Sequence, residues 1–150
     1  HGGIIKDGAK MVNAVANSVV PKFTIITGNS FGAGNYAMCG KAYDPRFIVS
    51  WPWAELAVMG GSQAAKVLVQ IQESTLKKQG KEITTEEHNK LVEKITQNYT
   101  KQTKVEYSAA RIWVDAIINP LDTRKWISAG IEVANNSPIT DKFNLGVIQV

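Results

Sequence analysis

The sequence predicts an α/β domain in which strands are joined by crossover connections. Short segments rich in β-branched residues alternate with glycine-containing loops and small-residue helices along residues 19–71, and this order is typical of layered α/β folds. A hydrophobic content of 44% over 150 residues is enough for one buried core. Together these observations exclude a β-sandwich and an all-helical bundle.

The chain begins with a predicted helix and a predicted strand. Residues 8–16 carry apolar side chains at helical spacing with alanines between them, and Asp7 stands where an N-cap is expected. Residues 19–27 are rich in β-branched side chains, with Pro21 near the start, where a strand tolerates proline. We expect the segment 22–27 to be an internal strand of its sheet.

Two further strands follow a glycine-rich loop. The loop 28–34 is expected to lead into a helix that starts near Gly34. Residues 47–51 and 54–59 are predicted to be short apolar strands, separated by Pro52. Because this proline bends the chain, the tryptophans on either side of it should differ in burial.

The next part of the chain is predicted to be helical and peripheral. A helix over 63–71, with Ser62 as its N-cap, opens after two glycines. The segment 72–104 is rich in Lys, Glu and Gln, and we interpret it as an amphipathic insertion on the outside of the domain. Within it, Thr84 and Glu87 have the spacing of a capping box.

Two C-terminal helices complete the predicted fold. The first covers 108–118 and is expected to turn four side chains inward, those of Ala110, Trp113, Val114 and Ile117. The second covers 122–135 and is preceded by an Asn-Pro pair that marks a helix start. No element is predicted after Pro138.

The basic excess of the chain does not form a nucleic-acid-binding surface. The 17 Lys and Arg exceed the 13 Asp and Glu by a net charge of +4. The most highly charged segment, 73–104, mixes seven Lys with five Glu, whereas a nucleic-acid binder usually shows a patch of one sign. Glu55 interrupts the longest apolar run, which stays below the ~20 residues of a membrane span. We expect neither nucleic acid nor a membrane as a partner.

Side chains for covalent catalysis or for metal binding are scarce. The sequence has one cysteine, Cys39, and two histidines, His1 and His88. Cys39 lies among small residues without a neighbouring histidine, which is typical of a buried structural thiol. His88 falls in the apolar stripe of a predicted helix and is interpreted as a packing or surface residue. No metal-ligand cluster is predicted, and the single cysteine fits a reducing compartment.

The most informative segment is the run of small residues after the first strand. Gly32, Ala33 and Gly34 allow main-chain N–H groups at a helix N-terminus to point into open space, where they stabilise a negative oxygen. The segment 32–37 also fits a loose dinucleotide-binding fingerprint, but four residues separate its first glycine from the strand and no acidic residue ends the next strand. Glycines that serve only close helix packing are the remaining alternative.

Several spaced motifs together resemble one enzyme family. They are FGAGNYAMCGKAY at 31–43, PRF at 45–47, VMGGSQAA at 58–65 and SAARIWVDAII at 108–118, and further matches at 3–11 and 120–124 keep the same order. This set resembles the carboxyltransferase (β) subunit of biotin-dependent acyl-CoA carboxylases, in particular the methylcrotonyl-CoA form. The resemblance covers nearly the whole chain.

The resemblance implies a fold and a site. Members of the family contain two crotonase-like halves, and residues 1–150 resemble the C-terminal portion of the second half, so a partial crotonase-like (ClpP/crotonase) layered fold is expected. The family places two backbone N–H groups, at the positions of Ala33 and Gly34, against the ureido oxygen of carboxybiotin. Four further residues match positions that line the biotin cavity, namely Phe31, Gly32, Gly60 and Gly61. For the last two glycines, helix capping is the alternative.

The resemblance also implies substrates and partners. Biotin would arrive carboxylated on a biotin carboxylase or biotin carrier subunit, the acceptor would be an acyl-CoA, and carboxyltransferase subunits would form a homo-oligomer in the bacterial cytoplasm or the mitochondrial matrix. Residues 32–35 favour a methylcrotonyl or geranyl acyl group, whereas residues 54–56 look more like the propionyl version. A biotin-dependent acyl-CoA decarboxylase and a non-catalytic or dinucleotide-binding α/β module are the alternatives.

Overall fold

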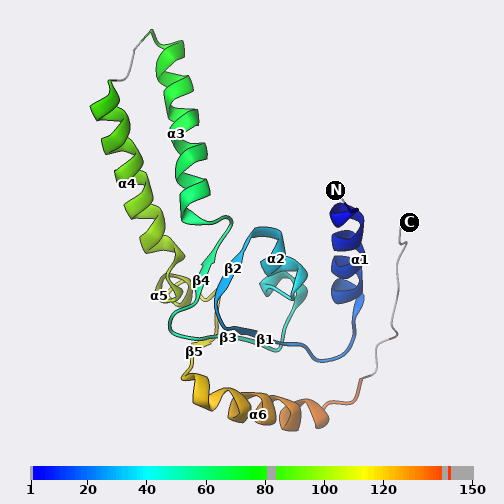
Figure 1. Ribbon diagram of the computed structural model, residues 1–150. Coiled ribbons are helices and arrows are strands. Elements are labelled where there is room, and N and C mark those ends of the chain that lie inside the picture. The colour runs from blue at the N-terminus through cyan, green and yellow to red at the C-terminus, as the bar shows by residue number, and fades with distance from the viewer. Residues whose placement is uncertain (1, 81–83, 140–141, 143–150) are drawn as a thin grey trace.

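Two small parallel sheets form the centre of the structure, a computed structural model that describes residues 2–80, 84–139 and 142 (Figure 1). The larger sheet has the order β1 (Phe23–Ile26), β3 (Phe47–Ser50), β5 (Ala116–Ile117), and the smaller one pairs β2 (Asn29–Phe31) with β4 (Glu55–Ala57). Every pair of strands is parallel. Parallel strands require crossover connections, so the predicted α/β class is confirmed.

The same supersecondary unit occurs twice in succession. Each copy contributes one strand to the larger sheet, then one strand to the smaller sheet, then a helix: β1, β2 and α2 (Gly32–Ala37), followed by β3, β4 and α3 (Gly61–Lys78). Because β2 and β4 are parallel neighbours, the helices that follow them begin at the same edge of the smaller sheet. This edge carries the candidate site.

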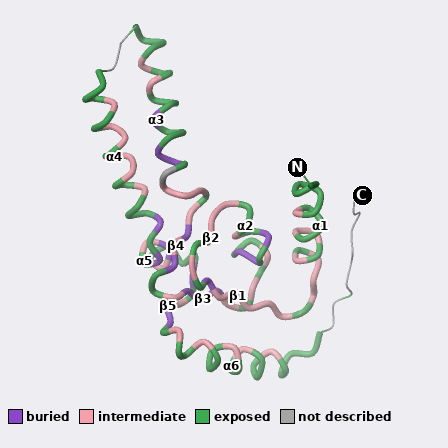
Figure 2. The backbone as a smooth tube through the Cα atoms, in the orientation of Figure 1, coloured by how far each residue is buried: buried purple, intermediate pink, exposed green. Residues whose placement is uncertain are grey.

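The hydrophobic core lies between the sheets and the short helix α5 (Val105–Ala109). Its buried members come from both sheets and from the segment after α3 and α4, and they are Ile26, Ile48, Ala54, Leu56, Val105 and Val114. Figure 2 shows the buried residues gathered at this centre, while the outer turns of the helices are exposed. The core therefore holds the two strand–helix junctions in place.

A helical hairpin projects from this centre, as expected for the peripheral insertion. Helices α3 and α4 (Thr85–Thr103) run side by side away from the sheets (Figure 1). The predicted capping box is confirmed, because the Glu87 N–H donates to Thr84 Oγ1 over 3.3 Å and the Thr84 N–H donates to Glu87 Oε2 over 2.9 Å. These two bonds satisfy donors that the first turn would otherwise leave free.

Two predictions for the N-terminal half were wrong in detail. Helix α1 (Ile4–Asn17) begins earlier than expected, so Asp7 lies in its first turn instead of at its cap. Strand β1 pairs only with β3 within the described residues and is an edge strand of this sheet, not an internal one. A hydrophobic run predicts a strand, but the number of its neighbours depends on tertiary pairing.

The junctions before α2 and α3 also differ from the prediction. A short strand, β2, replaces part of the expected loop, and α2 begins at Gly32, two residues before Gly34. Helix α3 is capped by the backbone of Gly60, so Ser62 lies inside the helix, which continues to Lys78 instead of ending at residue 71. The prediction placed the cap on a side chain, whereas a glycine backbone takes this position here.

The predicted helix 108–118 is wrong. Helix α5 ends at Ala109, the chain turns through Ile112 with φ +59°, and β5 then pairs with β3. Of the four side chains expected to face inward, Val114 is buried, whereas those of Ala110, Trp113 and Ile117 are exposed. The strand forms because β3 offers a free edge in the fold, which local periodicity does not reveal.

The last described helix agrees with the prediction. A turn of 3-10 helix (Pro120–Asp122), capped by Asn119 Oδ1, leads into α6 (Thr123–Asn135). Trp53 is 61% exposed and Trp51 is half-buried, so the expected difference in burial is confirmed. Among the helices that the structure describes, none is long and apolar enough to cross a membrane.

Candidate functional site

The two strand–helix junctions of the smaller sheet lie side by side. Phe31, the last residue of β2, pairs with Ala57 in β4, and the chain then enters α2 at Gly32 and α3 after Gly60. A Cβ atom built on Gly60 would lie 4.0 Å from Cε2 of Phe31. The structure therefore brings together Phe31, Gly32 and Gly60, three of the residues predicted to form the site.

Gly32 holds the two junctions in close contact. Its φ angle of +57° belongs to the left-handed region, and a Cβ atom at this position would lie 2.8 Å from the carbonyl oxygen of Val58. An L side chain disfavours this backbone conformation and would collide with the main chain that follows β4. Glycine is thus required at residue 32 for both reasons.

Ala33 and Gly34 occupy the first turn of α2 and are exposed. Helical geometry leaves the first N–H groups of a helix without an acceptor inside it, and no side chain caps α2. Gly34 faces open space, since no atom lies within 4 Å of a Cβ built on it. The N–H groups of Ala33 and Gly34, in this first turn, therefore have no acceptor within α2.

A cavity of about 370 Å³ adjoins this turn. It is lined by Gly32, by core residues of both sheets, and by Asn35, Tyr36, Lys41, Val58 and Trp113. The predicted residues Phe31, Ala33, Gly34, Gly60 and Gly61 do not line it. None of the lining residues other than Gly32 was predicted to belong to a site, because they come from six separate segments that only the fold brings together.

Gly61 serves packing at the base of the helical hairpin. A Cβ atom on Gly61 would lie 3.7 Å from Tyr99 Cδ1 and 4.0 Å from Thr100 Oγ1, both in α4. These distances are ordinary contacts, so Gly61 packs against α4, whereas Gly60 packs against Phe31. The glycine pair thus joins the site to the hairpin.

An ion pair borders the cavity. Lys41 Nζ lies 2.9 Å from Asp115 Oδ1, and Asp115 Oδ2 accepts a hydrogen bond of 2.7 Å from the Ile48 N–H. Partial burial acts to raise the pKa of Asp115, but the bond from Ile48 and the Lys41 ammonium together hold that pKa below its usual value. Asp115 therefore links the segment after α2, through Lys41, to strand β3, through Ile48.

The two titratable residues interpreted as structural have packing roles. Cys39 is buried just after α2 with φ +69°, and its backbone oxygen accepts a bond of 2.8 Å from Thr24 Oγ1. His88 Nδ1 contacts Glu73 Oε1 across the helical hairpin. Within the ranges that the structure describes, no group of three His, Cys, Asp or Glu residues is arranged to hold a metal ion.

The repeated strand–strand–helix units with parallel pairing are found in a partial, crotonase-like carboxyltransferase fold, as a solved structure shows. The solved structure of the geranyl-CoA carboxylase β subunit of P. aeruginosa superposes with a TM-score of 0.79 at 36% identity, over 99% of this chain and 27% of that one. The carboxyl transferase domain family matches residues 1–145. The chain belongs to this family.

Curated relatives agree with this assignment. The mitochondrial methylcrotonoyl-CoA carboxylase beta chain of Dictyostelium discoideum is 50% identical over 137 residues, which are 91% of this chain and 23% of that protein. The biotin-dependent 3-methylcrotonyl-coenzyme A carboxylase beta1 subunit of Mycobacterium tuberculosis is 44% identical over 149 residues, 99% of this chain and 28% of that protein. The chain spans about a quarter of the length of these relatives.

Proposed function

We propose that the full-length protein transfers a carboxyl group from carboxybiotin to an acyl-CoA, and that residues 1–150 are the C-terminal portion of its second crotonase-like domain. The observation that carries this proposal is the pair of main-chain N–H groups of the exposed residues Ala33 and Gly34, set beside a turn at residue 32 that strongly favours glycine. Membership of the carboxyl transferase domain family supports it.

The residues present fit the biotin head group. The ureido ring is flat and must approach the main chain closely, and the open space at Gly34 and the methyl group of Ala33 permit this approach. Phe31, Gly32 and Gly60 line the junction beside the two donors. When bound beside these residues, carboxybiotin would supply the carboxyl group that the acyl-CoA accepts.

The two amides act on the charge that develops during transfer. The N–H groups of Ala33 and Gly34 would stabilise negative charge on the ureido oxygen of the biotin head group more than they would stabilise its neutral ground state. One such donor contributes about 3–4 kcal/mol in comparable sites. No ionisable side chain of this chain is needed for the step.

The names of the relatives support a choice of substrate and partners. The proposed acceptor is a methylcrotonyl or geranyl acyl-CoA, which these names print, or a propionyl acyl-CoA, which residues 54–56 favour. The proposed donor partner is a biotin-carrying subunit, in the bacterial cytoplasm or the mitochondrial matrix. Large apolar side chains are exposed on several helices, Ile4, Ile5 and Leu121 among them. Their exposure supports contacts with the rest of the subunit and with further subunits of a homo-oligomer.

The proposal is tested with the full-length subunit and its biotin-carrying partner. The partner, loaded with radiolabelled carboxybiotin, is mixed with each of the three acyl-CoAs, and transfer of label into acid-stable product is measured. We expect label in at least one acyl-CoA, with the acyl preference identifying the substrate. Carboxyl transfer only in the reverse direction, from a carboxylated acyl-CoA to biotin, would identify a decarboxylase. The absence of transfer in both directions would contradict the proposed function.

A further inference from the structure

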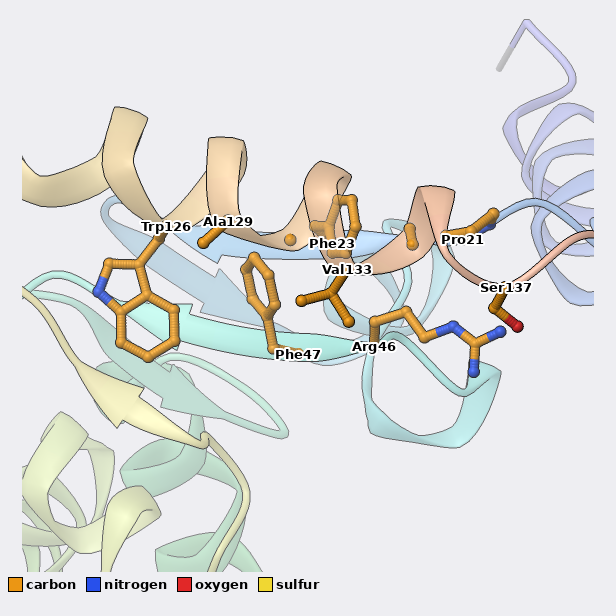
Figure 3. A pocket seen from close by; sticks show the side chains of 10 residues that line it. Pro21, Phe23, Arg46, Phe47, Trp126, Ala129, Val133 and Ser137 are labelled. Atoms are coloured by element: carbon orange, nitrogen blue, oxygen red, sulfur yellow. The ribbon is translucent and has the colours of Figure 1, made fainter.

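A second cavity, of about 410 Å³, lies between helix α6 and the larger sheet (Figure 3). Its aromatic wall is formed by three rings: those of Phe23 and Phe47 on the sheet stack with centroids 4.8 Å apart, and Trp126, from α6, meets the ring of Phe47 edge-on at 5.7 Å. The rest of α6 contributes small side chains such as Ala129 and Ala134. A flat apolar body is the shape that suits such a pocket.

The sequence of α6 creates this space. Gly130 is the point of closest approach, since a Cβ atom there would lie 2.7 Å from Phe47 Cε1 and 3.0 Å from Phe23 Cε1. Because α6 contacts the sheet at a glycine and carries alanines beside it, the space between helix and sheet on either side of this contact is left empty. The pocket is therefore a consequence of the packing of α6 on β1 and β3.

One end of the pocket is cationic. Arg46 and Ser137 lie together at this end, and Trp126 lies at the other (Figure 3). Arg46 is the only charged residue among those that line the cavity, and in the described part of the chain no carboxylate lies within ion-pair distance of its guanidinium. The last carbonyl groups of α6, at Val133 and Ala134, already accept bonds from Asn136 and Ser137. The guanidinium is thus free to bind an anion.

We propose that this cavity, which we call the α6 pocket, is a binding site for a small monocarboxylate with a flat apolar body. The body lies on the aromatic wall of Phe23, Phe47 and Trp126, and the carboxylate binds the guanidinium of Arg46. Guanidinium groups match carboxylates with two parallel N–H donors. A volume near the lower end of the range for ligand pockets favours a small molecule over a peptide.

The α6 pocket is separate from the amide site. The cavity beside Gly32 is lined by Ile26 and Ile48, whereas the α6 pocket is lined by Phe23 and Phe47, and the two cavities share no lining residue. Binding in the α6 pocket is therefore measurable without reference to carboxyl transfer. A negative result in the binding experiment would therefore leave the proposed carboxyl transfer untouched, and a negative result in the transfer assay would leave the α6 pocket untouched.

Calorimetric titration of the full-length subunit with 4-phenylbutyrate tests the proposal, and the neutral 4-phenylbutyramide is the matched control ligand. We expect saturable binding of one carboxylate per chain and at least about tenfold weaker binding of the amide, because a hydrogen bond to a charged group accounts for about a tenfold change or more. Arg46→Gln should weaken binding of 4-phenylbutyrate by a similar factor. Arg124→Gln, which removes an exposed arginine of α6 outside the pocket, should leave its affinity unchanged.

A second variant distinguishes binding inside the α6 pocket from binding elsewhere on the protein surface. Ala134→Phe fills the space next to the aromatic wall, so it should abolish binding while a melting curve shows that the subunit remains folded. Absence of saturable binding to the wild-type subunit would overturn the proposal, as would equal affinity for the carboxylate and the amide. An affinity for Arg46→Gln equal to that of the wild type would also overturn it.

Discussion

Replacement of Gly32 by alanine tests how the two strand–helix junctions are held together. At φ +57° an alanine costs about 1–2 kcal/mol relative to the right-handed conformation. The added Cβ would also stand 2.8 Å from the carbonyl oxygen of Val58, a main-chain atom that follows a paired strand and yields little. Such overpacking adds about 1–3 kcal/mol. We expect Gly32→Ala to destabilise the full-length subunit by about 2–5 kcal/mol.

Gly34→Ala is the matched control, two residues away in the same helix. No atom lies within 4 Å of a Cβ at residue 34, and its φ is not positive, so alanine should leave stability unchanged or raise it by up to about 1 kcal/mol through helix propensity. The urea midpoint of each variant, read by tryptophan fluorescence, measures the difference. Equal midpoints for both variants, or a larger loss for Gly34→Ala, would refute the assignment of Gly32 as the residue that requires glycine.

Three further predictions follow from the same structure. Thr84→Ala should remove the capping box and cost about 1 kcal/mol, seen as faster hydrogen exchange in the first turn of α4; unchanged exchange would contradict it. Asp115→Asn should lower stability at neutral pH, and the difference from the wild type should shrink as the pH falls through the lowered pKa of Asp115, because the carboxylate stabilises the fold only while it is ionised; a difference that grows in acid would show the opposite linkage. Residues 1–150 alone should not carboxylate an acyl-CoA, because a half-site lacks the donors and positioning of the missing part; turnover by this segment with carboxybiotin would disprove that.

Local chemistry made much of the fold predictable. The β-branched runs at β1 and β3 and the Thr84–Glu87 capping box act through neighbours in sequence, so their patterns predict structure directly. Strands β2 and β5 have three and two residues and form because a parallel partner lies beside them. Such short strands carry no periodicity of their own.

The site was predictable in part for the same reason. The small residues at 32–34 and the glycine at 60 lie at strand–helix junctions, which a sequence pattern marks. The cavity beside them depends on Lys41, Val58 and Trp113, which meet only when both sheets have formed. The α6 pocket likewise depends on Gly130 contacting rings of β1 and β3, which are far from α6 in the sequence. Contacts of this kind are set by tertiary packing and have no local signal.

The central claim, that the main-chain amides of Ala33 and Gly34 stabilise the biotin oxygen, is tested most directly by Gly34→Val in the full-length subunit. Gly8→Val, in open space on α1, is the matched control for the substitution, and Cys39→Ala tests a thiol mechanism. The rate of carboxyl transfer from carboxybiotin to the acyl-CoA is measured beside a melting curve. We predict that Gly34→Val lowers the rate by about a hundredfold or more with an unchanged melting temperature, while the other two variants stay within a few fold of the wild type. A normal rate for Gly34→Val together with an inactive Cys39→Ala would contradict the amide mechanism.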